Sequence, residues 1–398
     1  LTGAIEGEIA GVEDISVDPR LAFDYPAEVA FQQEVFPAVF GRALPDDPTA
    51  TEVSLVDRLR KQAQDIAEGI RAFVRDHAID ALLAENALAL PCHLSMGLGI
   101  AQVLRDDALL AVTHDHDFPW ERGARYATPY PAIQALIEET FPLVLPYVKH
   151  AVINRAAEAT LRERFAIADP TVVSNVMDFD APFATRDAYN ADLREALGLA
   201  SDDLLLVQIT RIVERKGIHT AIDLVARLDD PRVKLLITGT AVDDVEGYLP
   251  RLRHQVEDLS LGHQVLFAGD RFDNQRKRKE DGSKIYALAD AYAHADAMTY
   301  FSTYEGFGNA FVEAVCAKVP ILVNNYKPVY WPDIGSLGFN TVMIEDGHLT
   351  DAAVAKTRDL LADPERRQRS VQHNHALGRE HFSYEALERL LEPLFGRA

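Results

Sequence analysis

The feature that most constrains this chain is a regular alternation of short apolar segments with amphipathic ones. Strands that alternate with helices form parallel βαβ units, whose ligands bind at the carboxyl ends of the strands. We therefore predict an α/β protein with two Rossmann-like parallel-sheet domains. In the first series, strands are expected at 79–86, 108–117 and 147–155, and helices at 54–78 and 91–106. In the second, strands are expected at 204–211, 233–240, 264–271, 296–302 and 319–325, and helices at 217–228, 248–259, 285–295 and 309–318.

A turn-rich segment, "TVVSNVMDFDAPF", separates the two series at 171–183. It places the predicted boundary between an N-terminal domain, residues 1–175, and a C-terminal domain, residues 176–382. Two such domains that face each other leave a cleft, and clefts between domains are a preferred place for small-molecule sites.

The composition argues against two classes of function. A net charge of −22 argues against nucleic acid as a partner, because phosphate binding needs a basic surface. No apolar run approaches the roughly 20 residues of a membrane span, and no charged-then-apolar leader opens the chain, so we expect no integral membrane segment and a cytoplasmic location. Cys92 and Cys316 are expected to be buried free thiols. The sequence does not indicate an oligomeric state.

The stretch "TYEGFGNAFVEA", residues 303–314, carries Glu305 and Glu313 around a glycine-rich turn between a strand and a helix. Gly306 and Gly308 leave the main chain bare, and the start of the helix suits an anion. Eight helical residues would span about 12 Å, whereas an acid/base pair needs about 5 to 9.5 Å. The spacing instead suits the two hydroxyl-rich ends of one ligand. The alternative is a surface helix with two ordinary glutamates.

A second stretch, "RIVERKG" at 211–217, puts Arg211 and Lys216 between a strand and a helix. Two cations in this position can clamp a diphosphate, although a solvated basic loop is the alternative. Because both stretches should emerge at the same edge of one sheet, together they indicate a pocket for a nucleotide sugar. The charged run "RKRKE" at 276–280 is interpreted as a solvated loop.

With these motifs, the chain from about residue 170 to 398 resembles the retaining glycosyltransferases of family 4, which have the GT-B fold. The E-x7-E motif of that family is matched by Glu305 and Glu313, and its Arg…Lys-Gly loop by "RIVERKG". Its inter-domain N-x-x-D is similar to Asn175 and Asp178 of "SNVMDF". The end of the chain, 383–398, resembles the family's last helix, which crosses back onto the first domain.

The resemblance implies a role for each matched position. Arg211 and Lys216 would neutralise the departing diphosphate, and Glu305 would hold hydroxyls of the transferred sugar. Glu313 would bind the ribose, and the base would lie near Arg271. The implied donor-binding set is Gly306, Phe307, Gly308, Asn309, Glu313, Arg271 and Phe272.

In the first domain, "THDHD" at 113–117 ends a strand. A single histidine at this place in the family contacts the transferred sugar, and His114 matches it best, with His116 as second choice. A satisfied structural histidine is one alternative. A metal site is another, but consecutive residues of an extended segment point alternately, so at most half of the group could converge. We predict no metal. Weaker acceptor-side candidates are His116, Asp117, Trp120, Glu121, Arg122, Glu85 and Asn86. For Trp120, Glu121 and Arg122, loop packing is an equal alternative.

The sequence therefore predicts a retaining, metal-independent hexosyltransferase that needs no cofactor. Its donor would be a nucleotide diphosphate sugar, with UDP-glucose and GDP-mannose as leading candidates. Only 10 of the 40 basic residues are lysine, and this acidic, lysine-poor composition favours a small compatible-solute acceptor such as a glycerate or glucosylglycerate. The alternatives are a transferase for a cell-surface glycan, a sugar-nucleotide epimerase, a pyridoxal-dependent phosphorylase and a non-catalytic sugar-nucleotide binder.

Two departures from the family pattern are visible. After the strand at 319–325 the family has small residues, whereas this chain has the bulky "NNYKPVYWPDIG", which we expect to reshape the pocket. The first domain of the family begins with a strand, a glycine-rich turn and a helix, but "LTGAIEGE" reads as the end of a strand. We expect that residues precede Leu1 or that the domain lacks its first strand and helix. A dehydrogenase is disfavoured because "GLGIAQ", 97–102, sits inside a helix.

Overall fold

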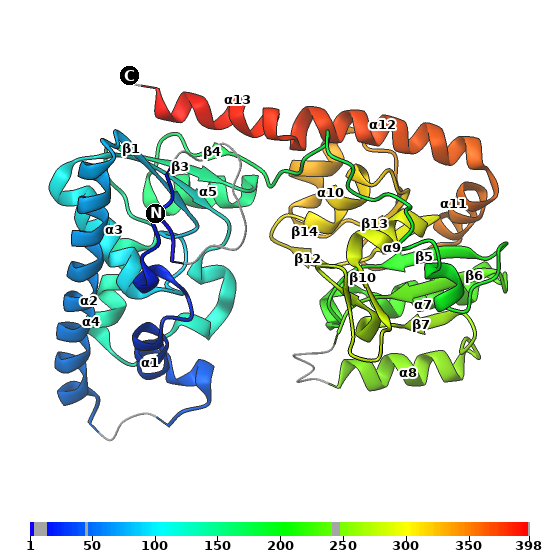
Figure 1. Cartoon of the computed structure of the whole chain (residues 1–398), viewed down its shortest axis with the longest axis horizontal. Helices are drawn as coiled ribbons and strands as arrows, with labels where there is room; N and C mark the ends of the chain where they lie inside the picture. The colour runs from blue at the N-terminus through cyan, green and yellow to red at the C-terminus, as the bar shows by residue number, and fades with distance from the viewer. Residues whose placement is uncertain (4–13, 44–46, 241–246, 397–398) are drawn as a thin grey trace. The chain divides into compact units, whose positions relative to one another are not determined.

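Two units make up the computed structural model, which describes residues 1–3, 14–43, 47–240 and 247–396 (Figure 1). Unit 1 comprises Leu1–Val173 and Arg389–Ala398, and unit 2 comprises Ser174–Glu388. Each unit contains a parallel sheet, as the predicted α/β fold class requires. Among the described residues, no helix combines the length and the apolar character that a bilayer span needs.

Unit 1 is built on a parallel sheet with the strand order β1-β2-β3-β4. Ile66 and Ile70 of helix α2 pack with Val103 of α3 and Leu82 of β1, which covers the sheet with apolar side chains. The strands are β1 (Ala81–Glu85), β2 (Leu110–Asp115), β3 (Val148–Val152) and β4 (Thr171–Val172). The helices are η1 (Pro19–Leu21), α1 (Pro26–Val35), η2 (Pro37–Phe40), α2 (Pro48–Asp76), α3 (Leu94–Asp107), η3 (Pro119–Tyr126), α4 (Pro131–Thr140) and α5 (Arg155–Phe165).

The main sheet of unit 2 has the strand order β7-β6-β5-β11-β13-β15, with all described pairs parallel. Numbered along the chain, this is the doubly wound order 3-2-1-4-5-6. The order reverses between β5 and β11, and ligands of such sheets bind beyond the carboxyl ends of the strands at this switch point. The strands are β5 (Leu204–Gln208), β6 (Val233–Ile237), β7 (Val265–Phe267), β11 (Ala297–Tyr300), β13 (Ile321–Asn324) and β15 (Val342–Ile344).

Helices cover both faces of a doubly wound sheet, so its strands are apolar throughout. Leu205, Leu206 and Val207 of β5 are fully buried, and so are Ile218 and Ile222 of α7, which share one helical face. The helices of unit 2 are α6 (Leu193–Ala196), η4 (Glu214–Lys216), α7 (Ile218–Leu228), α8 (Tyr248–Asp258), η5 (Gly269–Arg271), α9 (Leu288–His294), α10 (Asn309–Cys316), η6 (Tyr330–Ile334), η7 (Gly335–Leu337), α11 (Asp351–Ala362) and α12 (Pro364–Phe382). The last helix, α13 (Tyr384–Phe395), begins in unit 2 and passes into unit 1 at Arg389. Its short strands are β8 (Phe272–Asp273), β9 (Lys277–Arg278), β10 (Lys284–Ala287), β12 (Tyr304–Glu305) and β14 (Lys327–Pro328).

Two predicted helices begin later than expected. The segment 285–295 opens as strand β10, because Ile285 pairs with β9 and Tyr286 with β8, and α9 begins only at Leu288. The helix expected from residue 91 begins at Leu94, because the His93 side chain accepts a hydrogen bond from the main-chain N–H of Met96 at 3.2 Å and so caps the helix.

Three other expectations concern the charged run, the start of the chain and the two cysteines. The interpretation of 276–280 as a solvated loop is wrong at Arg276, whose guanidinium forms ion pairs of 2.5 Å with the buried Asp290 and 2.6 Å with Asp187. The strand expected at 1–8 falls largely on 4–13, outside the described residues. Cys92 and Cys316 are both free thiols, and Cys316 is buried while Cys92 is partly exposed.

Candidate functional site

The switch point of unit 2 brings together the two loops that the sequence singled out. Strands β5 and β11 are hydrogen-bonded neighbours. The loop after β5 carries Arg211 and Lys216, and the loop after β11 carries Glu305. The main-chain N–H of Thr303 donates to the carbonyl of Arg215 at 2.8 Å, so the loops are joined backbone to backbone. Both therefore lie at the same edge of one sheet, as predicted.

The loop after β5 is fixed from the core. Gln208, buried at the end of β5, donates from Nε2 to the carbonyl of Lys216 at 3.2 Å and accepts from Thr299 of β11 at 2.6 Å. Gly217 has φ +62°, and a Cβ there would lie 2.2 Å from the carbonyl oxygen of Phe301. Only glycine fits both the left-handed conformation and the close approach, and it positions Lys216 directly beside the end of β11.

One carboxylate in this loop pair is shared by two cations. Lys216 Nζ contacts Oε1 of Glu305, and Arg215 Nη1 lies 3.1 Å from Oε2. Arg215 also donates to the main-chain carbonyl of Tyr304 at 2.8 Å. The side chains of Lys216 and Glu305 are 11% and 10% exposed, so water screens their attraction weakly.

Burial and neighbouring charges set the protonation of this cluster. Burial raises the pKa of Glu305, but Lys216 and Arg215 outweigh it and hold the pKa below its ordinary value. Burial lowers the pKa of Lys216, and Glu305 compensates only in part, because Arg215 and Arg211 lower the pKa further. Arg211 and Arg215 alone outnumber the charge of Glu305, so the cluster favours an anionic ligand.

Arg211 is the exposed member of the cluster. Its side chain has no hydrogen-bond or ion-pair partner among the described residues, and its charge acts on Lys216. A permanently charged guanidinium that faces solvent beside a buried lysine is available to a phosphate group. The placement agrees with the diphosphate clamp that the sequence predicts.

The predicted donor-binding residues 306–309 connect Glu305 to helix α10, which begins at Asn309. Gly308 is the N-cap residue of α10. Asn309 is exposed, and its Oδ1 accepts a hydrogen bond from Nδ2 of Asn175 at 2.6 Å. The ring of Phe307 is buried against Phe382, with ring centroids 5.5 Å apart, so its side chain is not available to a ligand. The helix start therefore offers peptide N–H groups, together with an amide that a neighbouring asparagine orients.

The second glutamate of the motif, Glu313, lies about one turn into α10. Its Oε2 accepts a hydrogen bond from the hydroxyl of Tyr292 at 2.9 Å. Burial raises the pKa of Glu313, and the bond from Tyr292 offsets this only in part. The predicted contact of Glu313 with a ribose stays a prediction.

The predicted base-binding residues are engaged elsewhere in unit 2. Arg271 donates to the main-chain carbonyl of Ala196. The ring of Phe272 is buried and lies 5.9 Å from that of Tyr286. A base could meet the main chain here, but the Phe272 side chain serves packing.

The loops after β5, β6 and β7 touch through their main chains. A Cβ on Gly239, which follows β6, would lie 1.9 Å from the carbonyl oxygen of Thr210, which follows β5. A Cβ on Gly269, which follows β7, would lie 2.4 Å from the carbonyl oxygen of Gly239. The main-chain N–H of Ile212 also donates to Thr240 at 3.2 Å. We call these three contacting loops the glycine stack.

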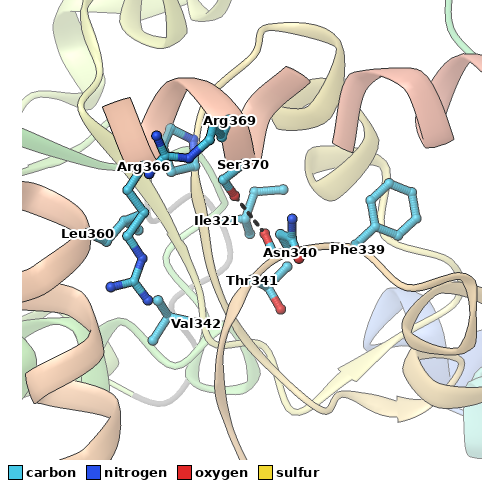
Figure 2. Close-up of a pocket in the computed structure, with 10 residues that line it drawn as sticks. Ile321, Phe339, Asn340, Thr341, Val342, Leu360, Arg366, Arg369 and Ser370 are labelled. Carbon is cyan, nitrogen blue, oxygen red and sulfur yellow. Dashed lines mark hydrogen bonds between the residues drawn. The ribbon is translucent and has the colours of Figure 1, made fainter. Parts of the chain in front are cut away.

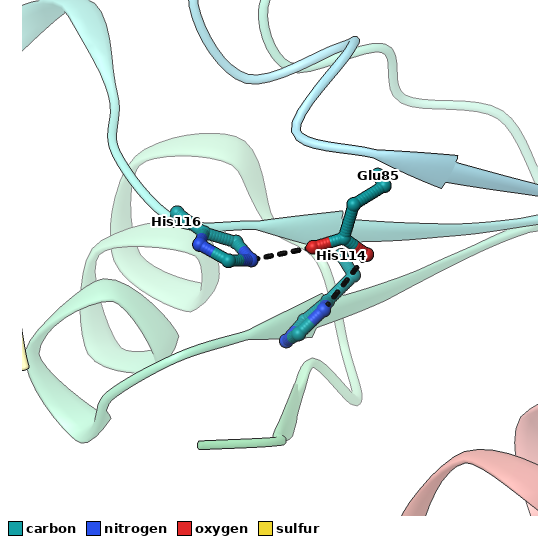
Figure 3. A group of neighbouring side chains, drawn as sticks. All are labelled: Glu85, His114 and His116. Atoms are coloured by element: carbon teal, nitrogen blue, oxygen red, sulfur yellow. Dashed lines mark hydrogen bonds and ion pairs between the residues drawn. The ribbon is translucent and has the colours of Figure 1, made fainter. Parts of the chain in front are cut away.

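At the corresponding edge of unit 1, two strands bring a glutamate and two histidines together (Figure 3). Glu85 of β1 is the register partner of His114 of β2. His114 Nδ1 lies 3.0 Å from Oε2 of Glu85, and His116 Nε2 lies 2.6 Å from Oε1. His114 Nε2 lies 2.8 Å from the main-chain oxygen of Val173, so both its nitrogens are engaged. The main-chain N–H of His116 donates to the side-chain Oδ1 of Asn86 at 3.0 Å.

Charges in this group reinforce one another. Burial raises the pKa of Glu85, but hydrogen bonds from His114 and His116 outweigh it and lower the pKa to about 2. Burial lowers the pKa of His114, yet Glu85 and the carbonyl of Val173 outweigh it and raise the pKa. His114, the first choice for a sugar contact, is therefore tied to protein groups on both sides, whereas His116 is the more exposed of the two.

The remaining acceptor-side candidates support their own loop. Trp120 is stacked on Phe118, with ring centroids 4.5 Å apart and planes 5° apart. Glu121 accepts from the main-chain N–H of Phe118 at 2.8 Å, and Arg122 lies 2.5 Å from Asp117. These contacts are those of loop packing, the alternative that the sequence left open.

A separate cavity of about 380 Å³ lies in unit 2 at the opposite edge of the sheet (Figure 2). Ile321 and Val342, which line it, are the first residues of β13 and β15. Its two arginines, Arg366 and Arg369, are exposed and form ion pairs of 3.7 Å and 3.5 Å with acidic neighbours on α11 and α12. Because ligands of doubly wound sheets bind at carboxyl ends, this cavity is not the candidate site.

Sequence reasoning missed three groups that hold the site. Arg215 directly precedes Lys216 in "ERKG", and this position next to a predicted site residue is the signal that could have identified it. Tyr292 and Gln208 gave weaker signals, because a tyrosine in a helix and a glutamine at the end of an apolar strand are common without a role. The contact of Tyr292 with Glu313 joins residues 21 positions apart, and that of Gln208 with Thr299 joins residues 91 positions apart.

Comparisons with known proteins find similar glycosyltransferases. The family model described as glycosyl transferases group 1 matches residues 190–375. Mannosylglucosylglycerate synthase of Thermotoga maritima is 30% identical over 371 residues, which cover 86% of this chain and 81% of that protein. Mannosylglucosylglycerate synthase of Petrotoga mobilis is 32% identical over 285 residues, which cover 67% of this chain and 64% of that protein.

Among solved structures, Anabaena HepE in complex with UDP superimposes with a TM-score of 0.61 at 18% identity, over 85% of this chain and 82% of that one. This likeness concerns the fold, which is GT-B, as predicted. The sequence relationship to the Thermotoga protein extends over most of both chains. With the family match on the unit that holds Lys216 and Glu305, it shows that the chain belongs to the group 1 glycosyltransferases.

Proposed function

We propose that this protein transfers a hexose from a nucleotide diphosphate sugar to a hydroxyl group of a small polar acceptor, with retention of anomeric configuration. Both mannosylglucosylglycerate synthases among its relatives are named for a mannosylated glucosylglycerate. Mannose as the sugar and glucosylglycerate as the acceptor are therefore the leading pair. The free thiols Cys92 and Cys316 agree with a reducing cytoplasm.

The observation that carries the proposal is the contact of Lys216 and Arg215 with Glu305, at the switch point and directly before α10. An anionic diphosphate fits between these cations and the peptide N–H groups at the start of the helix. Glu305, still ionised, can accept hydrogen bonds from sugar hydroxyls next to the diphosphate.

The reaction follows from this charge distribution. The bond between the sugar C1 and the diphosphate oxygen breaks while the acceptor oxygen bonds to C1 on the same face. The acceptor proton passes to the departing phosphate oxygen. Negative charge develops on the diphosphate, and Arg211 and Lys216 stabilise it from fixed positions, which lowers the barrier. We propose that these side chains do the work that a divalent cation performs at the diphosphate in other transferases.

The experiment incubates the protein with GDP-mannose or UDP-glucose and glucosylglycerate, and follows release of the nucleoside diphosphate and formation of product. The anomeric configuration of the product is read by proton NMR. We expect transfer with one of the two donors and a retained configuration. An inverted product overturns the mechanism, and donor binding without transfer or hydrolysis would identify a non-catalytic binder.

A further inference from the structure

The histidine and glutamate group of unit 1 has the composition and the spacing of a metal site. One carboxylate oxygen of Glu85, one ring nitrogen of His114 and one of His116 all lie within 4.8 Å of one another. In the described part of the chain, this is the one group of at least three His, Cys, Asp or Glu side chains placed closely enough to hold a metal ion. Two imidazoles and one carboxylate are a common ligand set for zinc and related dications.

The position of Val173 settles which nitrogen of His114 can act as a ligand. Its carbonyl oxygen lies 2.8 Å from Nε2 and can only accept a hydrogen bond, so Nε2 carries the proton. In the neutral ring Nδ1 then presents a lone pair toward Oε2 of Glu85, 3.0 Å away. A lone pair that faces a carboxylate is repulsive unless a second ring proton or a metal cation lies between them. A carbonyl behind a histidine is also the outer support that metal-binding histidines use.

The scaffold around the group is rigid. Glu85 and His114 are register partners at the ends of two hydrogen-bonded strands, and the main-chain N–H of Asn86 donates to His114 at 2.8 Å. His116 follows two residues later, on the same side of the extended chain. Its main-chain N–H donates to the side chain of Asn86. Metal–ligand distances of about 2.0–2.2 Å place neighbouring ligand atoms about 3–3.5 Å apart. The observed 3.0 Å and 2.6 Å need a small outward movement, and the widest pair of ligand atoms in the group, up to 4.8 Å apart, has to move closer.

We propose that Glu85, His114 and His116 bind one divalent transition-metal ion of the Zn²⁺ or Co²⁺ class, through a carboxylate oxygen, Nδ1 and Nε2. The side chain of Glu85 is 54% exposed and that of His116 is 31% exposed. The open side leaves further coordination positions to water or to an oxygen of a small ligand. Lysine and arginine supply the positive charge in unit 2, so this ion is not the one that would bind a diphosphate there.

The test uses the full chain without a polyhistidine tag, stripped with a chelator and then freed of it. Co²⁺ is titrated while its visible d–d absorption is followed, and Zn²⁺ is added to displace it. We expect one Co²⁺ per chain and a Zn²⁺-dependent rise in melting temperature, because the ion binds only the folded state. Glu85→Gln and His116→Ala should each weaken Co²⁺ binding more than about 10-fold, since loss of outer-shell partners alone costs about 10–100-fold.

The matched control is His254→Ala, which removes a histidine that pairs with a single carboxylate, Asp258, at 3.4 Å. It should leave the titration unchanged. Absence of Co²⁺ bands in the wild-type chain overturns the proposal and identifies the group as a carboxylate held by imidazolium ions. Equal binding by wild type and Glu85→Gln also overturns it. The glutamine variant keeps the side-chain shape, so it decides the matter even if His116→Ala folds poorly.

Discussion

The two units share one device at the carboxyl edge of their sheets, a carboxylate held between two basic side chains. In unit 2 Glu305 lies between Arg215 and Lys216, and all of the contacts come from loops. In unit 1 Glu85 lies between two histidines at the ends of paired strands. The same arrangement therefore occurs once with permanent cations and once with rings that can be neutral.

This difference decides what each edge can bind. Guanidinium and ammonium groups have donors and no lone pairs, so the cluster in unit 2 can bind an anion and cannot ligate a metal. Neutral imidazole has a lone pair, so the group in unit 1 can ligate a dication. One carboxylate thus supports opposite ligands, according to the side chains on either side of it.

The largest effect is expected from Lys216→Ala. Removal of one fixed donor from a developing oxyanion costs about 10²–10³-fold in turnover, and the same loss is expected here. Initial rates at saturating donor and acceptor measure it. Lys356→Ala, on the exposed face of α11, is the control and should transfer normally. A near-normal rate in the Lys216 variant would place the transition-state charge elsewhere.

A crossed pair of substitutions tests whether the two carboxylates act independently. Glu305→Gln should slow transfer by about 10–100-fold, because hydrogen bonds to charged groups are worth about 1.5–3 kcal/mol. It should leave Co²⁺ binding unchanged. Glu85→Gln should weaken Co²⁺ binding more than about 10-fold while UDP or GDP still binds, as calorimetry can measure. The comparison breaks if either variant loses both properties.

The glycine stack offers a test of how unit 2 fixes its loops. Gly239→Ala should lower the free energy of unfolding by about 1–3 kcal/mol, the usual cost of forcing extra atoms into packed space. Gly262 has open space around its Cβ position and a φ outside the left-handed region, so Gly262→Ala is the control. Urea unfolding followed by fluorescence measures both. Equal stability of the two variants contradicts the close contact.

The smallest effect is a pH dependence. Burial raises the pKa of Glu305, but Lys216 outweighs it, so the folded-state pKa lies below the ordinary 4.5. A depressed carboxylate pKa contributes stability that is full above pH 4.5 and is lost as the pH falls through the folded-state value. The stability difference between wild type and Glu305→Gln should therefore shrink below about pH 4.5. A difference that grows on acidification would oppose this sign.

Much of the fold could be predicted because its signal is local. Apolar strands alternating with amphipathic helices specify parallel βαβ units, and parallel strands bring their following loops to one edge. From that rule alone, Lys216 and Glu305 could be predicted to lie close together. The segment 285–295 failed because its first residues pair with strands that have little local signature, so tertiary pairing overrode a helical pattern.

The group in unit 1 shows where sequence reasoning stops. Alternation along an extended chain puts His114 and His116 on one side, and this much could be predicted. The third member, Glu85, joins them only through the register of β1 against β2. The proton on His114 depends on Val173, which is 59 residues away along the chain. Both facts are non-local, and no pattern in "THDHD" contains them.

The glycine stack also bears on how such enzymes can be re-engineered. Three loops that touch through their main chains cannot be exchanged one at a time, because the main-chain path of each loop is limited by the loop next to it. A grafted side chain at Gly239 would push against the loop that carries Arg211, and one at Gly269 would push against the loop that carries Gly239. Attempts to transplant donor preference from a relative should therefore move the segments after β5, β6 and β7 as one cassette.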